Sequence, residues 1–249
     1  MPITFSKKAL YAIELIQTTE SNVFITGKAG TGKSTLLEHL RKNLKKKTVV
    51  LAPTGVAAIN VNGDTIHSFF TLKPGFEKQE AKNSRISEEK QKRYKRLETI
   101  LIDEISMVRA DLLDAVDIVL RKARKDHRAF GGVQMVFIGD LFQLPPVVTP
   151  QDQEIFFSEY TSPYFFDAQV FQPSNDFFSE DFTLETIELD HIYRQKDDDF
   201  IQILNAVRNN SITPNHLAKL NARCDASFSN VRTNNQKKII HLMTTNADA

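Results

Sequence analysis

A glycine-rich segment between an apolar run and a helix-like run constrains the fold of this chain more than any other feature. Residues 27–34 read GKAGTGKS and fit the pattern G-x-x-x-x-G-K-[ST]. Glycines let the backbone curl with its amides pointing inward, and the N-terminus of the following helix adds positive partial charge. We therefore expect a phosphate-binding loop between a strand and a helix. A glycine-rich turn without a ligand is the alternative.

Short apolar runs alternate with helix-like segments along the chain, which predicts an α/β fold with a parallel sheet flanked by helices. The apolar runs, each bounded by glycine, proline or a carboxylate, lie at 22–26, 48–52, 99–103 and 133–139. Apolar residues recur at helical spacing at 33–46 and 110–125. Further along, we expect a strand at 184–189, helices at 199–209 and 214–223, and a strand at 238–244.

Two stretches interrupt this alternation. Residues 73–98 are charged and poor in apolar side chains, so we expect an inserted, solvated excursion in the form of a hairpin or a short helix. Residues 150–182 are acidic and rich in phenylalanine. We interpret these aromatic side chains as packing residues, because the surrounding acidic groups repel phosphate.

Charge is unevenly distributed along the chain. The sequence has 32 Lys+Arg and 31 Asp+Glu, for a net charge of +1. Residues 1–150 carry a net charge of +8, residues 151–199 a net charge of −11 and residues 200–249 a net charge of +4. A basic body with a separate acidic stretch indicates a polyanionic partner that only one part of the chain meets.

The composition also bears on the compartment. The single cysteine, Cys224, excludes a disulfide framework and a cysteine-based zinc cluster, and it fits a reducing compartment. No run of 18 apolar residues is present, and residues 1–20 lack the apolar stretch of a signal peptide. We expect a cytoplasmic chain that does not enter the membrane.

The phosphate loop and the strand that ends at residue 103 together predict catalytic chemistry on a nucleoside triphosphate. Lys33 can reach the β- and γ-phosphates, and Ser34 can offer its hydroxyl to Mg²⁺. Asp103 is expected to hold the Mg²⁺, and Glu104 to orient and deprotonate the attacking water. A second carboxylate indicates hydrolysis rather than transfer to another substrate. A pair of helix-capping carboxylates before Ser106 is the alternative.

Further residues complete the expected nucleotide site. Gln143, in the segment GDLFQLPP at 139–146, is suited to contact the γ-phosphate through its amide, although a turn with two prolines also explains that segment. The residues expected to bind the nucleotide are Gly27, Ala29, Gly30, Thr31, Gly32, Lys33, Ser34 and Thr35.

Two segments suggest contact with nucleic acid. Small residues at 52–58 (APTGVAA) would let a phosphate backbone approach, and Thr54 could donate to one phosphate. Residues 65–70 (TIHSFF) offer a hydroxyl, an imidazole and aromatic rings that could stack on bases. The same aromatic side chains, at helical spacing, could instead be core. The residues expected at the DNA are Pro53, Thr54, Gly55, His67, Ser68 and Phe69.

Taken together, these motifs resemble a known family. The segments GKAGTGKST, LAPTGVAA with GDTIHSFF, LIDEISMV, GGVQMVFIGDLFQLPPV and ELDHIYRQKDDDFIQILNAVRNN occur in this order. They resemble the petite-integration-frequency DNA helicases of superfamily 1, particularly the bacterial members, over residues 3–246.

The resemblance implies an ATP-dependent helicase core that moves 5′ to 3′ along single-stranded DNA and acts at forked DNA in repair or recombination, with Mg²⁺ as cofactor and as a monomer. It implies a first RecA-like domain at 1–183, a wedge subdomain at 73–98, and the beginning of a second RecA-like domain at 184–249. Arg194 matches the arginine that reaches the γ-phosphate. Thr54, His67 and Phe69 match segments that line the DNA track.

Two departures from the family pattern affect what is expected. Ala9 stands where the family usually has a glutamine that reads adenine, so selectivity for adenine is less secure. The chain also ends within a family motif, so we expect a fragment that binds nucleotide weakly and unwinds nothing by itself. A nucleotide-switched DNA-binding or regulatory ATPase without motor activity is the alternative, and a phosphotransferase is a third reading for which no acceptor site is visible.

Overall fold

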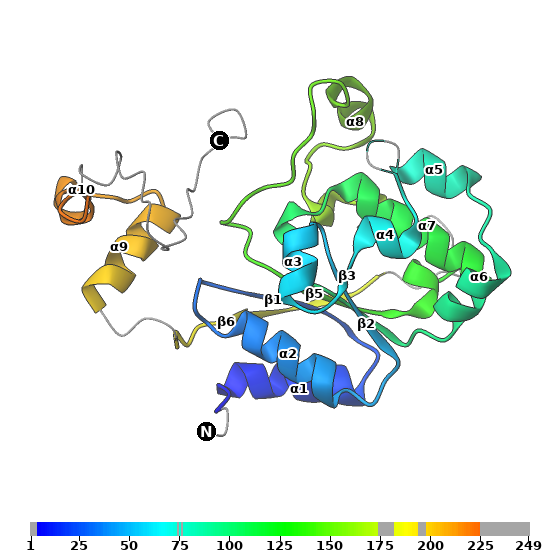
Figure 1. Cartoon of the computed structure of the whole chain (residues 1–249), viewed down its shortest axis with the longest axis horizontal. Helices are drawn as coiled ribbons and strands as arrows, with labels where there is room; N and C mark the ends of the chain where they lie inside the picture. Colours follow the sequence, from blue (N-terminus) through cyan, green and yellow to red (C-terminus); the bar gives the residue numbers. More distant parts are fainter. Residues whose placement is uncertain (1–3, 74, 76, 174–181, 194–197, 225–249) are drawn as a thin grey trace, which may run out of the picture. The chain divides into compact units, whose positions relative to one another are not determined.

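The computed structural model describes residues 4–73, 75, 77–173, 182–193 and 198–224. The chain divides into two compact units, Met1–Lys196 and Asp197–Ala249. The first unit contains a twisted sheet with helices on both faces (Figure 1). None of the helices in the described ranges combines the length and the apolar character that a bilayer-spanning segment requires.

The sheet of the first unit is parallel throughout its six strands, which confirms the predicted fold class. In spatial order the strands are β3-β2-β4-β5-β1-β6. Their bounds are β1 (Asn22–Gly27), β2 (Thr48–Ala52), β3 (Asp64–Thr65), β4 (Thr99–Ile102), β5 (Gln134–Ile138) and β6 (Leu184–Leu189). The apolar runs predicted as strands therefore form strands within one or two residues of their expected bounds.

Side chains of successive strand residues point to opposite faces, and each face has its own apolar cluster. Val23 and Ile25 of β1 pack with α1 (Lys7–Thr18) and α2 (Lys33–Asn43), whereas Phe24 between them packs in the second cluster. The helices that contribute to the second cluster are α4 (Ile66–Phe70), α5 (Glu77–Asn83), α6 (Glu88–Lys95), α7 (Ala110–Arg124) and α8 (Gln153–Glu159). Strands covered on both faces explain why their sequences are apolar throughout.

Shorter elements connect these layers. The helix α3 (Gly55–Asn60) follows β2, and its first turn is capped by the Thr54 hydroxyl, which accepts from the Ala57 amide at 3.2 Å. The 3₁₀ turns lie at Ile105–Met107, Ala129–Gly132, Phe165–Asp167 and Gln169–Phe171.

The edge strand β6 belongs to the sheet of the first unit, where it pairs with β1 along its whole length, from Asn22↔Leu184 to Gly27↔Leu189. The boundary predicted after residue 183 therefore differs from the division into compact units, which follows Lys196. The physical reason is that the outer edge of β1 obtains hydrogen-bond partners from β6. A short apolar strand looks the same in sequence whether it ends one sheet or begins another.

The second unit contains α9 (Asp198–Arg208) and α10 (Pro214–Asn221), close to the helices expected there. Lys219 of α10 pairs with Asp199 at 2.7 Å, and Arg223 lies over the Phe200 ring at 5.0 Å. The strand predicted at 238–244 lies outside the described residues.

The inserted residues 73–98 form α5 and α6, so the expectation of a helix there is confirmed. The insertion is less solvated than expected, because Ala81, Tyr94 and Leu97 are buried in the cluster that includes α7. Tyr94 also donates its hydroxyl to the Phe69 carbonyl at 2.8 Å.

The packing role predicted for the phenylalanines of 150–182 is confirmed for those that join the cluster around α7, whereas Phe157 and Phe166 are exposed and Phe177 and Phe178 lie outside the described residues. Phe156 and Phe165 are buried, and the Phe165 ring meets that of Phe137 at 5.6 Å between centroids. The buried carboxylate of Asp114 on α7 accepts from the Tyr160 hydroxyl at 2.6 Å and from the Val170 amide at 3.0 Å. Burial and this hydrogen bond raise the pKa of Tyr160, so the phenol stays neutral.

Candidate functional site

The carboxyl ends of the parallel strands meet at one edge of the sheet, which is where ligands bind in open α/β folds. The strand register places Ile25 of β1 beside Ile138 of β5, and Phe137 of β5 beside Ile102 of β4. The segments that follow these three strands therefore emerge at the same level. They are the phosphate loop, the pair Asp103–Glu104, and the segment that begins at Gly139.

The phosphate loop has the backbone geometry that the glycines predict. Gly30 and Gly32 adopt left-handed conformations, with φ of 83° and 89°, and Gly32 begins α2 without a side-chain cap. A Cβ atom at Gly27 would lie 2.6 Å from the Leu189 carbonyl oxygen, so only glycine fits between β6 and the loop. The first amides of α2 thus face the curve of the loop.

Polar side chains of the loop converge on the same curve. The Lys33 ammonium donates to the carbonyls of Gly27 at 2.5 Å and Lys28 at 3.2 Å, so it lies against the loop. Thr31 is buried, and its hydroxyl donates to the Lys28 carbonyl at 2.8 Å. Ser34 and Thr35 are exposed in the first turn of α2. Both belong to the set of nucleotide contacts predicted at 27–35.

Asp103 and Glu104 lie at the end of β4, opposite the loop. The Asp103 amide donates to the Leu51 carbonyl at 2.9 Å, which fixes the residue to β2. Burial and the neighbouring Glu104 raise the pKa of the Asp103 carboxyl to about 6, and the Lys33 ammonium acts in the opposite direction. That influence means that the Lys33 and Asp103 charges are within electrostatic range of each other.

Glu104 has a left-handed backbone, with φ of 50°, and begins the 3₁₀ turn at Ile105–Met107. This conformation is unfavourable for a residue with a Cβ and reverses the chain directly after the strand. The chain therefore turns away instead of extending β4, and the Glu104 carboxylate lies at the edge of the sheet.

The donor set fits Mg²⁺. Asp103 and Ser34 carry oxygen atoms of the kind that Mg²⁺ prefers, and Mg²⁺ typically takes one or two protein carboxylates together with substrate phosphates and waters. Within the described ranges, no three His, Cys, Asp or Glu side chains gather into a metal-binding group.

The segment after β5 contacts the turn after Glu104. A Cβ at Gly139 would lie 2.9 Å from the Ile105 side chain, so the two segments touch through a glycine. Gln143 is exposed, and its amide contacts the buried Asp140 carboxylate at 3.3 Å. Asp140 thereby orients Gln143, a role that the sequence reasoning missed, although the Gly139-Asp140 pair at a strand end was a signal for it.

Tyr193 also lies at the phosphate loop, which the sequence reasoning missed. Its amide donates to the Gly30 carbonyl at 2.8 Å, and its ring lies 3.4 Å from the position of a Cβ at Gly32. Tyr193 immediately precedes Arg194, the predicted γ-phosphate contact, which lies outside the described residues.

Of the predicted DNA contacts, Gly55 and Ser68 are exposed, Pro53, Thr54 and His67 are half-buried, and Phe69 is buried. Pro53, Thr54 and Gly55 follow β2, and His67 and Ser68 follow the short β3, so all five come from the same edge of the sheet. The side chain of Phe69, by contrast, is buried.

Phe69 has a packing role in this structure. It is 4% exposed, packs with Phe70 and Tyr94, and is covered by the Arg93 guanidinium at 4.2 Å from the ring centroid. The structure therefore does not place the Phe69 ring where a base could stack on it. The alternative, that these aromatic side chains belong to the core, describes its environment.

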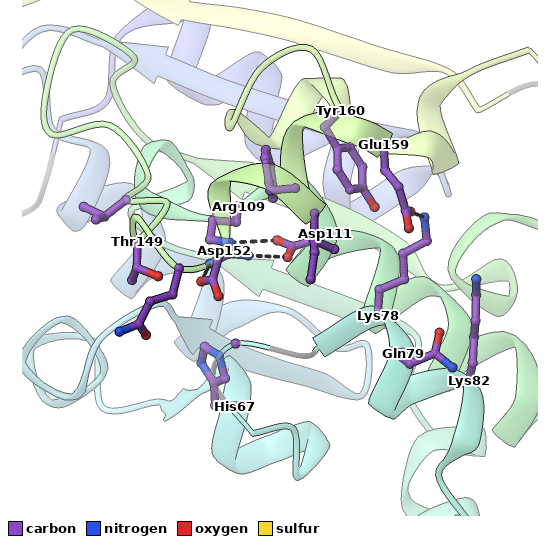
Figure 2. Close-up of a pocket in the computed structure, with 15 residues that line it drawn as sticks. His67, Lys78, Gln79, Lys82, Arg109, Asp111, Thr149, Asp152, Glu159 and Tyr160 are labelled. Atoms are coloured by element: carbon purple, nitrogen blue, oxygen red, sulfur yellow. Dashed lines mark hydrogen bonds and ion pairs between the residues drawn. The ribbon is translucent and has the colours of Figure 1, made fainter.

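A cavity of about 640 Å³ lies between α4, α5 and α8 (Figure 2). His67 lies on one side, and Lys78, Gln79 and Lys82 of α5 lie on another. The charges that line it are largely paired, because Arg109 binds both Asp111 and Asp152, and Lys78 binds Glu159. Paired charges do not select for phosphate, so this cavity is a weaker nucleotide site than the loop.

The raised pKa of Asp103 predicts that its charge destabilises the metal-free fold. A carboxyl with a folded-state pKa of about 6 and an unfolded value of about 3.9 is ionised in both states at pH 7, at a cost to the folded state. In EDTA at pH 7, we expect Asp103→Asn to raise the free energy of unfolding by about 2 kcal/mol. Wild-type stability should approach that of the variant as the pH falls from about 6 to about 4, because the folded state then binds the proton first.

Asp126→Asn is the matched control with the opposite sign. The Arg128 hydrogen bond lowers the pKa of Asp126, so that carboxylate stabilises the fold above its unfolded pKa, and its removal at pH 7 should destabilise. Urea unfolding of both variants across pH 4–8 measures these effects. A less stable Asp103→Asn protein at pH 7 would contradict the electrostatic account of this site.

Comparisons with known proteins agree with this geometry. The sequence profile of one family, described as PIF1-like helicase, matches residues 5–217. The ATP-dependent DNA helicase PIF1 of Saccharomyces cerevisiae is 38% identical to this chain over 218 residues, which are 84% of this chain and 23% of that protein.

Solved structures show the same similarity. A crystal structure of a Bacteroides Pif1 bound to single-stranded DNA superposes with a TM-score of 0.84 at 38% identity, over 99% of this chain and 55% of that chain. A structure of Pif1 helicases on forked double-stranded DNA gives a TM-score of 0.79 at 40% identity, over 88% of this chain and 51% of that chain. The chain thus spans about half the length of the solved chains and less of the yeast protein.

Proposed function

The chain belongs to the PIF1-like helicase family, and on that premise we propose that it is part of an ATP-dependent DNA helicase. In this proposal it uses ATP to move 5′ to 3′ along single-stranded DNA and to separate the strands of forked DNA, in repair or recombination. The relatives described above support this, since they include an ATP-dependent DNA helicase and Pif1 structures with single-stranded and forked DNA.

The first unit is proposed as the RecA-like ATPase domain and the second as the start of another RecA-like domain. The loop at 27–35 binds the triphosphate through its amides and Lys33. Mg²⁺, held by Ser34 and Asp103, would neutralise charge on the phosphates when bound. Glu104 accepts the proton of the attacking water, and Gln143, with Arg194, contacts the γ-phosphate.

One observation carries the proposal. Parallel strands bring the phosphate loop, the Asp103–Glu104 pair and the Gly139–Asp140 turn to one edge of the sheet. The Thr54 and His67 segments leave the same edge from β2 and β3. Nucleotide and DNA would therefore bind at adjacent parts of one edge, which suits coupling between hydrolysis and movement.

The intact protein tests this proposal. We expect phosphate release from ATP to rise at least about tenfold when single-stranded DNA is added, because DNA completes the hydrolytic arrangement in a coupled motor. Stopped-flow translocation on dye-labelled oligonucleotides should give a lag that grows with strand length, for labels at the 3′ end. A nucleotide-switched binding module would bind DNA without such a lag, and that result would exclude a motor.

A further inference from the structure

The C-terminal end of α5 is bound by a cation from α7. The Lys122 ammonium donates to the carbonyls of Ala81, Lys82 and Ser84 at 3.1, 3.0 and 2.9 Å. The last carbonyls of a helix have no partner within the helix and carry negative partial charge. A lysine that reaches three such carbonyls satisfies them and joins the two helices.

The C-terminal end of α6 is bound in the same way by Arg124, which lies two residues after Lys122 in the last turn of α7 and points to a different side of that helix. Arg124 donates through Nη1 to the carbonyls of Tyr94, Lys95 and Leu97 at 2.9, 3.2 and 2.9 Å. Its Nε donates to the Gly131 carbonyl at 2.5 Å, which ties the guanidinium to the turn before β5. The final turn of α7 therefore binds both inserted helices. Figure 1 shows α5 and α6 beside α7.

The insertion has further attachments to the first unit, among them an ion pair between Arg93 and Asp64 and a hydrogen bond from Lys90 to Thr71. Tyr94 binds the carbonyl of Phe69 in α4, the helix that carries His67. Lys78 of α5 pairs with Glu159 of α8, as Figure 2 shows for the rim of the cavity. The insertion is thus held against the ATPase unit by polar contacts on several sides, and the two cations of α7 provide six of them.

We propose that Lys122 and Arg124 are positioning residues that hold the inserted helices rigidly to α7, so that the insertion can resist the DNA duplex during strand separation. This rests on the proposed helicase function. The wedge at 73–98 is implied by the resemblance to the helicase family, which does not indicate what holds it in place. The structure assigns that role to α7, whose first turn follows the Asp103–Met107 segment. The element proposed to separate the strands and the carboxylates proposed for hydrolysis are therefore both connected to α7.

The proposal separates strand separation from movement on a single strand. If the insertion moves when the duplex presses on it, a step of the protein along the DNA does not separate base pairs at the fork. On a single strand there is no duplex to press on the insertion. Loss of the two cations should therefore lower unwinding while ATP hydrolysis and single-strand translocation continue. A residue needed only for folding would lower all three activities together.

The test uses Lys122→Met, Arg124→Met and the double variant of the intact protein. Lys45→Met is the matched control, because Lys45 is an exposed lysine that follows α2 and lies outside both α7 and the insertion in sequence. Three rates are measured for each: DNA-stimulated ATP hydrolysis, translocation on single-stranded DNA, and unwinding of a fork of high G·C content. For the double variant we expect unwinding to fall by about tenfold or more, and the other two rates to stay within about twofold of wild type.

Conservative variants and hydrogen exchange keep the test decisive if a methionine variant is globally less stable. Lys122→Arg and Arg124→Lys retain the charge, and unwinding should follow the number of carbonyl contacts that remain. Exchange should accelerate in α5 and α6 but not in β1 or β5. Equal losses of unwinding and translocation, or unchanged unwinding in the double variant, would overturn the proposal. A wild-type protein that does not translocate would instead overturn the proposed function.

Discussion

Replacing Lys33 by alanine is expected to lower DNA-stimulated ATP hydrolysis by about 10²–10³-fold, the usual effect of removing one charged donor from a reacting group. The Lys33 ammonium lies against the phosphate loop and acts on the Asp103 carboxyl. Its loss removes positive charge from the position proposed for the β- and γ-phosphates. It also removes the influence that opposes the rise in the Asp103 pKa, so that pKa should rise further.

Phosphate release with and without single-stranded DNA measures this effect, and a fluorescent ATP analogue measures binding. Lys45→Ala removes an exposed lysine of the same unit and should leave both unchanged. Hydrolysis by Lys33→Ala at a rate near that of wild type would remove the nucleotide-site assignment at 27–35.

Replacing Glu104 by glutamine is expected to lower the rate of hydrolysis by about 10²–10⁴-fold, the usual contribution of a general base, with ATP binding retained. Glutamine keeps the shape of the side chain and tolerates the same 3₁₀ turn, so the loss is confined to proton transfer. The two variants should therefore differ in kind, because Lys33→Ala weakens binding as well as hydrolysis, whereas Glu104→Gln accumulates the ATP-bound protein.

Single-turnover hydrolysis with bound radiolabelled ATP distinguishes them. Glu20→Gln, at an exposed glutamate after α1, is the control for removal of one negative charge. If Glu104→Gln turned over ATP at the wild-type rate, the attacking water would have to be activated by another residue, and the role given to Glu104 would be wrong.

The sequence was most informative where local chemistry and fold coincide. Apolar runs buried on both faces of a parallel sheet predicted the strands, and the phosphate loop was predicted because glycine, lysine and serine spacing reflects backbone geometry. The parallel arrangement then brought Asp103 and Gly139 beside the loop without further information. The roles of these residues in catalysis stay predictions.

The sequence was less informative where a residue acts through contacts distant along the chain. Phe69 is equally compatible with a stacking platform and a core, and its burial depends on Tyr94 and Arg93 from the insertion. Likewise, nothing local to Lys122 or Arg124 indicates that their partners are carbonyls some 30–40 residues earlier. The same limit explains the boundary after 183, since only pairing with β1 assigns β6 to the first sheet.

The hydrogen bond between the Tyr193 amide and the Gly30 carbonyl has a consequence for communication within the protein. The chain leaves the first sheet through β6 and is attached at once to the loop that would hold the triphosphate. A shift of that loop would therefore be transmitted to Tyr193 through one backbone hydrogen bond, without rearranging the packed interior. That amide thus joins the phosphate loop to the segment that directly follows β6.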